Sequence, residues 1–236
     1  LIGSGSTCTG CASVRCEGMT TAIIFDLDGT LADSTACVVG AAQFVGDALG
    51  LTTVTDDAIR RRIGEPLGPM LGALFSIDGP VLDAAVKAYS TRYVEMAQDG
   101  ERPFEGAVPM LTALRAAGFK LAIATGKSQN GAERASERMG LAPLMDAIHG
   151  IVPGTPGKPD PAVLVRAMAS LGVSASDCVM VGDTTFDLDL AHAVGVRTAA
   201  VSWGVHSVAL LQSREPTAMV ASCLLYTSPS PRDFQV

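Results

Sequence analysis

The sequence predicts an α/β fold in which a doubly wound, Rossmann-like parallel sheet carries an inserted helical domain. Over residues 105–222, short apolar runs alternate with segments of helical periodicity, which is typical of a parallel sheet covered by helices. An earlier apolar run, 21–25, has the β-branched character of a buried strand. Between these regions, residues 34–104 repeat Ala, Leu and Met at helical spacing. We therefore expect a core made of residues 19–33 and 105–222, and a helical cap made of residues 34–104.

Each expected element has its own local signal. Gly118 is expected to stop the first core helix, and Ser128 to cap the second. The cap is expected to contain four helices, near 34–49, 55–62, 66–75 and 80–98. The expected core helices cover 107–117, 129–139, 160–170 and 186–194, and the expected later strands cover 120–124, 147–149, 178–181 and 197–202.

The composition of the 236 residues excludes several classes of function. Lys and Arg number 17 against 24 Asp and Glu, for a net charge of −7. Proteins that bind nucleic acid through its phosphates are usually basic, so no nucleic-acid partner is expected. No apolar run reaches the roughly 18 residues that a membrane span needs, and no signal segment is recognised. We expect a soluble, cytoplasmic protein, monomeric or homodimeric, without a membrane partner.

The first 18 residues differ from the rest of the chain. They lack periodicity and contain Cys8, Cys11 and Cys16, followed by Met19 just before the first apolar run. A zinc site needs a fourth ligand, and no histidine lies nearby to provide one. We expect residues 1–18 to be a non-native upstream segment that can be removed with little effect.

The other end is also unusual. Residues 223–233 read CLLYTSPSPRD, which resembles the translation of a transposon-end sequencing adapter. The alternative is an ordinary Pro/Ser-rich tail. We expect residues 223–236 to be derived from that adapter, so that the natural sequence runs to about Ser222.

Polar residues follow the expected strands at the positions where parallel sheets bind ligands. In open α/β sheets, ligand sites lie beyond the carboxyl ends of the strands. The sequence places polar clusters there or just before a later helix, and these are expected to meet at one edge: Asp26-Leu27-Asp28-Gly29-Thr30, Thr125-Gly126-Lys127-Ser128, Gly157-Lys158-Pro159 and Gly182-Asp183-Thr184-Thr185-Phe186-Asp187.

The carboxylates in these clusters indicate a cation. Asp26 and Asp28 can face one site as the strand gives way to a turn, and Gly29 permits that turn. Asp183 arrives from another strand, and carboxylates gathered at one point repel each other unless a cation or proton intervenes. Because the donors are hard oxygens without Cys or His, the expected cofactor is Mg²⁺.

The remaining polar groups indicate a phosphate. Thr125 and the helix that begins at Ser128 offer hydrogen-bond donors to phosphate oxygens. Lys158 can neutralise the remaining charge. A metal, a lysine and a free carboxylate around a phosphate suggest an aspartyl-phosphate intermediate.

Four segments then resemble a known family. FDLDGTLADS, IATGKS, GKPDP and GDTTFDLDLAHAVG resemble, in order, the motifs of the haloacid dehalogenase superfamily, specifically its capped phosphatases such as phosphoglycolate phosphatases. The resemblance implies that Asp26 is the nucleophile and Asp28 the general acid/base. It also implies that Thr125 and Lys158 bind phosphate.

The resemblance also implies the metal ligands. They would be Asp26, the backbone carbonyl of Asp28, Asp183 and, through water, Asp187. Three further residues are expected to line the phosphate site: Gly29, Thr30 and Gly126.

The expected function is Mg²⁺-dependent hydrolysis of a small phosphorylated metabolite, similar to phosphoglycolate, through an aspartyl-phosphate intermediate. The alternatives within the superfamily are a sugar phosphomutase and a pyrophosphatase. Outside enzymes, the alternative is a regulatory or binding module, because fold alone does not determine function.

Substrate choice is expected to lie in the cap. Arg60, Arg61 and Arg62 either form a solvated surface or provide a cation for a substrate carboxylate, with Gly64 shaping the loop that follows. Lys127 either contacts the ligand or is a solvated residue at the helix entry.

Overall fold

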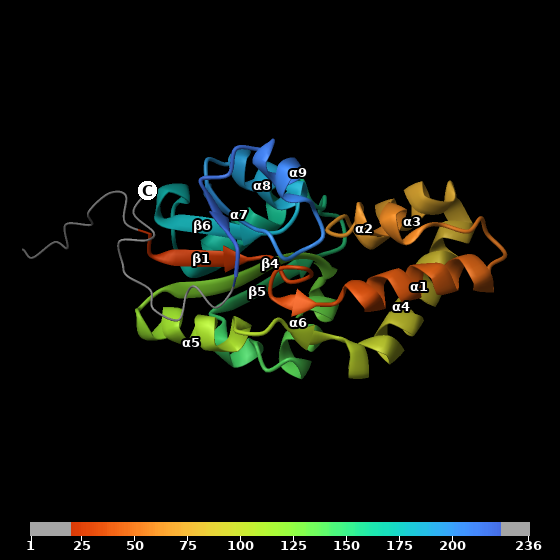
Figure 1. Cartoon of the computed structure of the whole chain (residues 1–236), viewed down its shortest axis with the longest axis horizontal. Helices are drawn as coiled ribbons and strands as arrows, with labels where there is room; N and C mark the ends of the chain where they lie inside the picture. The colour runs from red at the N-terminus through yellow and green to blue at the C-terminus, as the bar shows by residue number, and fades with distance from the viewer. Residues whose placement is uncertain (1–19, 223–236) are drawn as a thin grey trace, which may run out of the picture.

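The computed structural model describes residues 20–222, so the expectations for 1–18 and 223–236 lie outside the described residues. The molecule has two parts (Figure 1). A sheet covered by helices forms one, and helices α1–α4 form the other, beyond one end of the central strands.

The sheet has six parallel strands in the order β5-β4-β1-β6-β7-β8. The strands are β1 (Ala22–Phe25), β4 (Lys120–Ser128), β5 (Ala147–Ile151), β6 (Cys178–Gly182), β7 (Arg197–Val201) and β8 (Ala218–Val220). All four residues of β1 are buried, because the strand lies between β4 and β6 and both of its faces are covered.

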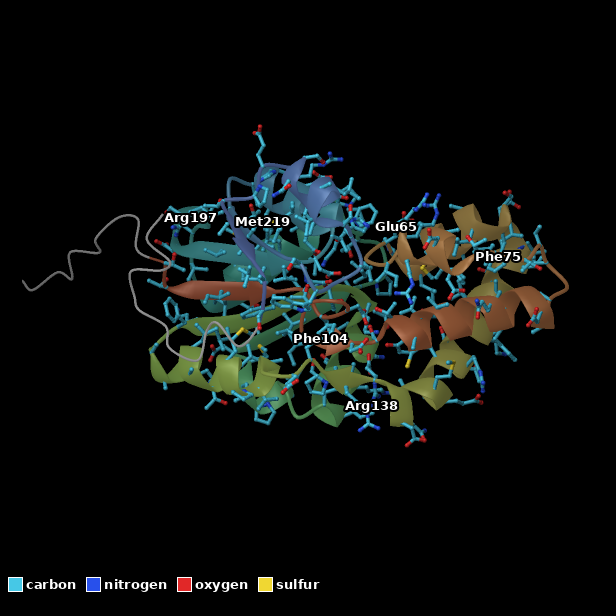
Figure 2. All side chains as sticks on the ribbon, viewed as in Figure 1. Glu65, Phe75, Phe104, Arg138, Arg197 and Met219 are labelled. Carbon is cyan, nitrogen blue, oxygen red and sulfur yellow. The ribbon has the colours of Figure 1, made fainter. Side chains whose placement is uncertain are left out.

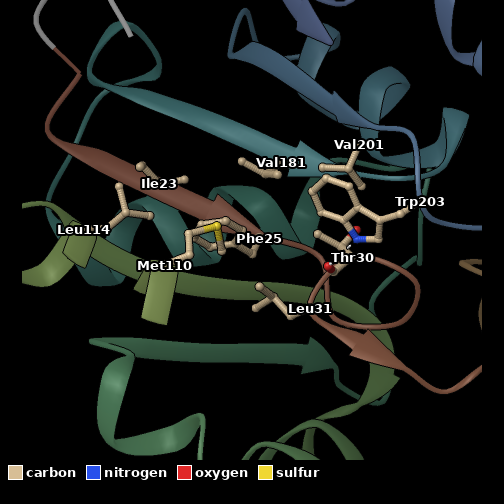
Figure 3. Close-up of a pocket in the computed structure, with 9 residues that line it drawn as sticks. All are labelled: Ile23, Phe25, Thr30, Leu31, Met110, Leu114, Val181, Val201 and Trp203. Atoms are coloured by element: carbon tan, nitrogen blue, oxygen red, sulfur yellow. Dashed lines mark hydrogen bonds between the residues drawn. The ribbon is translucent and has the colours of Figure 1, made fainter. Parts of the chain in front are cut away.

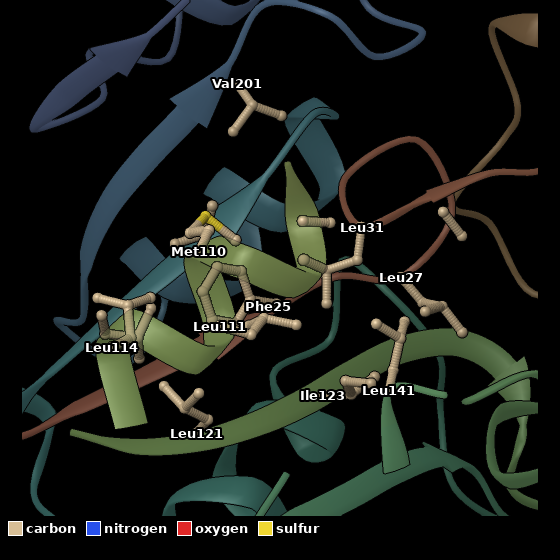
Figure 4. Packing of buried hydrophobic residues seen from close by; sticks show 14 of the residues in the cluster. Phe25, Leu27, Leu31, Met110, Leu111, Leu114, Leu121, Ile123, Leu141 and Val201 are labelled. Atoms are coloured by element: carbon tan, nitrogen blue, oxygen red, sulfur yellow. The ribbon is translucent and has the colours of Figure 1, made fainter. Parts of the chain in front are cut away.

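Helices cover both faces of this sheet (Figure 1). They are α5 (Ala107–Ala116), α6 (Gln129–Arg138), α7 (Ala162–Leu171), α8 (Thr185–His192) and α9 (Val208–Gln212), with short 3₁₀ turns at Ala142–Leu144 and Ala175–Asp177. Ile23 and Phe25 of β1 pack in one hydrophobic cluster with α5 residues such as Leu111 (Figure 4), whereas Ile24 packs in a second cluster with α7 residues such as Leu164. Since successive strand residues point to opposite faces, this division confirms the predicted doubly wound fold.

The cap residues fold around a hydrophobic cluster of their own. The cap helices are α1 (Thr35–Ala48), α2 (Asp56–Arg60), α3 (Leu67–Phe75) and α4 (Gly79–Gly100). Val45, Leu71 and Tyr89 are among the buried members of this cluster. At the base, β2 (Ala32–Asp33) pairs antiparallel with β3 (Arg102–Pro103), so the two chain segments that enter and leave the cap lie side by side.

Some elements differ from the sequence prediction. Strand β4 continues to Ser128 instead of ending at residue 124, with a shift in its pairing to β5 between Ala124 and Ser128. The Gly and Lys in that extension carry no strand signal, so only pairing with β5 reveals it. The elements β2, β3, α9 and β8 were not predicted. β2 and β3 have two residues each and β8 has three, too short for an alternating pattern, and the five residues of α9 make little more than one helical turn.

A small void beside β1, lined by residues such as Phe25, Met110 and Trp203, is shown in Figure 3. It has a volume of about 10 Å³, room for about one water molecule. Trp203 closes one side, where its indole Nε1 donates a hydrogen bond of 3.1 Å to the carbonyl of Thr30. This void is a packing gap and is too small for a ligand.

Within residues 20–222, no single helix is both long enough and apolar enough to cross a membrane. Only α3 and α4 taken together pass by length and composition, and they are bent by 116° relative to each other.

Candidate active site

Asp26 follows β1 directly and lies at the carboxyl edge of the sheet. Its backbone N–H donates a 2.8 Å hydrogen bond to the carbonyl of Val181, which continues the strand ladder, and the residue is 1 % exposed. Gly29 forms the turn that follows, with φ of 81°. A Cβ on Gly29 would lie 2.2 Å from Oδ2 of Asp183, so both conformation and space require glycine there.

Lys158 lies between two buried carboxylates. Its Nζ is 2.7 Å from Oδ1 of Asp26 and 2.5 Å from Oδ1 of Asp187. Burial alone would lower the pKa of Lys158, but Asp187 and Asp26 outweigh it and raise that pKa above its ordinary value. The ammonium group therefore stays charged and holds Asp26 in place.

The carboxylates carry more negative charge than Lys158 can balance. Burial, together with Asp187 and Asp28, raises the pKa of Asp26 to about 7 even though Lys158 lowers it. Burial, with the charges of Asp187 and Asp26, also raises the pKa of Asp183 well above its ordinary value. A further positive charge at this place would relieve the repulsion.

Asp183 and Asp187 are fixed by hydrogen bonds. Oδ1 of Asp183 accepts from the Thr30 hydroxyl at 2.8 Å, and its Oδ2 accepts from the Val205 N–H at 2.8 Å. Oδ2 of Asp187 accepts from the N–H and hydroxyl of Thr184 and thereby caps α8. Each carboxylate is therefore held in one orientation.

The donor set fits a magnesium ion. Asp26, Asp183 and Asp187 each offer one carboxylate oxygen, and these atoms lie within 4.8 Å of one another. The donors are buried, hard oxygens, and the raised pKa values of Asp26 and Asp183 show that burial and neighbouring carboxylates disfavour their charged forms, a cost that a bound cation would offset. The side chain of Asp28 lies outside this group, so a ligand from that residue would have to be its backbone carbonyl.

Asp28 points toward the cap. Its Oδ1 accepts a 2.5 Å hydrogen bond from the Ser34 hydroxyl and lies 3.0 Å from Nζ of Lys127. Asp26 and Asp28 both line a cleft with a volume of about 680 Å³ between the core and the cap. The two aspartates thus face the same cleft from neighbouring positions.

Thr125 and Gly126 line the same cleft. The Thr125 hydroxyl accepts from the Lys127 N–H at 3.3 Å, so its own proton remains available to a ligand. Gly126 lies against the cap loop, where an added Cβ would come within 2.7 Å of the Gly64 carbonyl. The core and the cap loop meet closely here, at a position that tolerates no side chain.

Sequence reasoning missed a buried charge network at the junction of core and cap. Glu101, whose side chain is fully buried, accepts from the Tyr93 hydroxyl at 2.6 Å and pairs with Arg138. Lys127 Nζ donates to the Tyr93 hydroxyl at 2.7 Å and also reaches Asp28. Tyr93 and Glu101 lie in α4 and directly after it, whereas Lys127 comes from β4 and Arg138 from α6, so no local spacing connects the cap residues with the core residues.

The predicted cap arginines do not reach the cleft. Arg60 and Arg61 are exposed, and Arg62 forms a 3.0 Å ion pair with Glu65. Glu65, labelled in Figure 2, lines the cleft, but the three arginines do not. The reason is the packing of their neighbours, the buried Ile59 and Ile63, which turn the intervening residues toward solvent.

The cations that line the cleft come from the core instead. They are Lys127 and, on one face of α6, Arg134 and Arg138. Arg134 and Arg138 are four residues apart, so helical periodicity places them on one face of α6, but no local signal shows that this face meets the cap. Gly64, by contrast, lines the cleft, with φ of 103°, and its expected part in substrate choice stays a prediction.

The protein is therefore a doubly wound α/β protein with a buried carboxylate cluster at the carboxyl ends of its strands. The profile of the family described as haloacid dehalogenase-like hydrolase matches residues 23–201. The chain belongs to that family, which confirms the resemblance seen in its four motifs.

Similar proteins support the same assignment. A phosphoglycolate phosphatase of Rhodospirillum rubrum is 34% identical and aligns over 88% of this chain and 87% of its own length. An N-acetylmuramic acid 6-phosphate phosphatase of Pseudomonas aeruginosa is 30% identical over 78% and 82% of the two chains. A haloacid dehalogenase-like hydrolase of Streptococcus pneumoniae superposes with a TM-score of 0.79, at 26% identity, over 88% of this chain and 96% of its own. The chain is thus an enzyme, a phosphoric monoester hydrolase of this family.

Proposed function

We propose that this enzyme is a Mg²⁺-dependent phosphatase that hydrolyses a small phosphorylated metabolite through an aspartyl-phosphate on Asp26. The observation that carries the proposal is the placement of Asp26. Its carboxylate lies at the floor of the cleft, held by Lys158, beside two further buried carboxylates.

In the first half-reaction, a carboxylate oxygen of Asp26 attacks phosphorus and the bond from phosphorus to the leaving-group oxygen breaks. Asp28 donates a proton to that oxygen, so the product leaves as an alcohol. Lys158 holds Asp26 in its attacking orientation, and the Thr125 hydroxyl donates to a phosphoryl oxygen. When bound, Mg²⁺ supplies positive charge that lowers the repulsion between the phosphoryl group and the carboxylates.

In the second half-reaction, water attacks the phosphorus of the aspartyl-phosphate. Asp28, now a carboxylate, accepts a proton from this water, and the bond between Asp26 and phosphorus breaks. Inorganic phosphate leaves, and both aspartates return to their starting protonation states. The same side chain thus serves as acid and then as base.

Phosphoglycolate is the first substrate to test, because the R. rubrum relative carries that name. We place the enzyme in the cytoplasm, in line with the free thiols of Cys37 and Cys178, the cysteines within the described range. The roles of Gly29 and Thr30 are to shape the site and hold Asp183, as their contacts suggest.

The test is phosphate release by the purified chain with Mg²⁺ and after EDTA treatment. We expect turnover of phosphomonoesters with Mg²⁺ alone, without a bisphosphate activator, and loss of turnover with EDTA that Mg²⁺ restores. A strict need for a sugar bisphosphate would favour a phosphomutase, and hydrolysis confined to pyrophosphate would favour a pyrophosphatase. Equal turnover with and without metal would contradict the proposal.

A further inference from the structure

The cleft is a long channel between a cap helix and a core helix. The lining residues of α4 lie on one face of that helix, and so do those of α6: Val86, Tyr89, Ser90, Tyr93, Val94 and Ala97 on α4, and Asn130, Gly131, Arg134, Ala135 and Arg138 on α6. From Val86 to Ala97 the wall extends about 16 Å at about 1.5 Å per residue. A phosphoglycolate molecule bound at Asp26 would therefore occupy only one end.

The α4 wall is apolar and partly open. Val94 is 50% exposed, and Tyr93 lies beside it along the channel. The start of α3 adds Leu67 and Met70 to the same lining. Apolar surface left open in a cleft of this volume is typical of a site that covers an apolar ligand segment.

Most of the charged groups in the channel already have partners. Lys127 is held by Asp28 and Tyr93, and Arg138 pairs with buried Glu101. Glu65, on the opposite side, pairs with Arg62. Each of these ions is therefore neutralised within the protein.

Arg134 is different. It lines the channel from α6, it is exposed, and it forms no ion pair with any residue in the described range 20–222. A guanidinium group at the wall of a binding cleft, without a protein carboxylate, is available to an anionic group of a ligand.

We propose that Arg134 determines specificity by binding an anionic group on the leaving group, and that the substrate is an extended phosphomonoester whose apolar body lies along α4. This inference rests on the proposed function. Phosphate would be held at Asp26, the apolar segment between α4 and α6, and the distal anion at Arg134. The substrate would thus be longer than phosphoglycolate.

The test compares phosphoglycolate with synthetic aryl phosphates. The matched set is 3-(4-phosphooxyphenyl)propanoate, its uncharged propanamide and the corresponding propylphosphonate. With Mg²⁺, we expect wild-type kcat/KM to be about tenfold or more higher for the anionic aryl phosphates than for the amide, the scale of a charged hydrogen bond. Preference between the carboxylate and the phosphonate identifies which anion the site takes.

Arg134→Gln should remove this preference chiefly by raising KM for the anionic compounds, while hydrolysis of the amide falls much less. Arg134→Lys should restore part of the preference. Arg60→Gln, which removes an exposed cation outside the cleft, is the matched control and should leave the ratio as in wild type. Val94→Asp should weaken hydrolysis of the aryl phosphates more than that of phosphoglycolate.

Two results would overturn the inference. One is a wild-type preference for phosphoglycolate over every aryl phosphate, and the other is a loss in Arg134→Gln that is equal for charged and uncharged substrates. If wild type hydrolyses none of the compounds, the proposed function fails instead. Titration calorimetry with a non-hydrolysable arylmethylphosphonate carrying the same propanoate then decides the role of Arg134, because equal affinity of wild type and Arg134→Gln would exclude it.

Discussion

The buried corner formed by Asp26, Asp183, Asp187 and Lys158 lies next to the cleft wall, which is the face of α4 that lines the cleft. The two regions are built on opposite principles. In the corner, Asp26, Lys158 and Asp187 are at most 3% exposed, and each charge touches another charge. Along the wall, Val86 and Val94 present apolar surface to the cleft. A buried charge that loses its partner is costly, so the corner has one arrangement. The wall has no such restriction, and it can accommodate different leaving groups.

The largest effect is expected from Asp26→Asn. The amide is a poor nucleophile for phosphorus, so kcat should fall by at least about a thousandfold for every substrate. Steady-state kinetics on short and long phosphomonoesters measure this, with circular dichroism to verify folding. A well-folded variant with kcat near that of wild type would contradict covalent catalysis by Asp26.

Lys158→Met tests whether the corner depends on the Lys158 ammonium group for folding. Removing the ammonium group leaves Asp26 and Asp187 facing each other without compensation, which should lower the free energy of unfolding by about 3 kcal/mol. Urea unfolding of Lys158→Met is compared with Lys87→Met, which removes an exposed lysine from α4. Equal stabilities of the two variants would show that the corner does not need its lysine.

Mg²⁺ should stabilise the corner by binding. At a concentration a hundred times its dissociation constant, a ligand specific for the folded state adds about 2.7 kcal/mol. We therefore expect Tm to rise with Mg²⁺ in wild type, and the rise to disappear in Asp183→Asn. Asp189→Asn, which changes a partly exposed carboxylate on α8 that pairs with Arg214, is the control and should keep the rise. An undiminished rise in Asp183→Asn would place the metal elsewhere.

Glu101→Gln tests the junction between the two regions. The change removes the charge that faces Arg138 and Lys127, and a hydrogen bond to a charged group contributes about 1.5–3 kcal/mol. We expect a stability loss near the lower end of that range, since Arg138 is partly exposed to solvent. The exposed Glu95→Gln, which loses a pair with Arg92 on α4, should change stability much less. If both variants lose the same stability, the junction is no more than a surface ion pair.

The smallest effect is expected from Arg62→Ala. Its pair with Glu65 is partly exposed to solvent, so stability should change by less than about 1 kcal/mol. Activity should fall little, and by the same factor for charged and uncharged leaving groups. A selective loss on carboxylated substrates, measured as kcat/KM, would return specificity to the cap arginines and contradict the role proposed for Arg134.

The difference between the two regions also explains why the sequence predicts the residues of the corner but not those of the cleft wall. The corner follows from local signals and one topological rule. Asp26 and Asp183 each come directly after an apolar strand, and parallel strands bring their carboxyl ends to one edge. The cleft wall depends on how α4 lies against α6, and neither helix contains a pattern that specifies the other.

Apart from β2, β3, α9 and β8, sequence alone determined the order of strands and helices along the chain, the double winding of the sheet and the meeting of its polar strand ends. Periodicity and turn residues are local properties, so they can be found without knowing the neighbours of a residue. Tertiary structure alone decided which cations face the cleft, because Arg62 and Arg134 look equally polar in the sequence. Packing of Ile59 and Ile63 turns Arg62 outward, while the face of α6 that carries Arg134 meets the cap. Which face of a helix meets another element is set by contacts between residues far apart in the chain, and local sequence does not record those contacts.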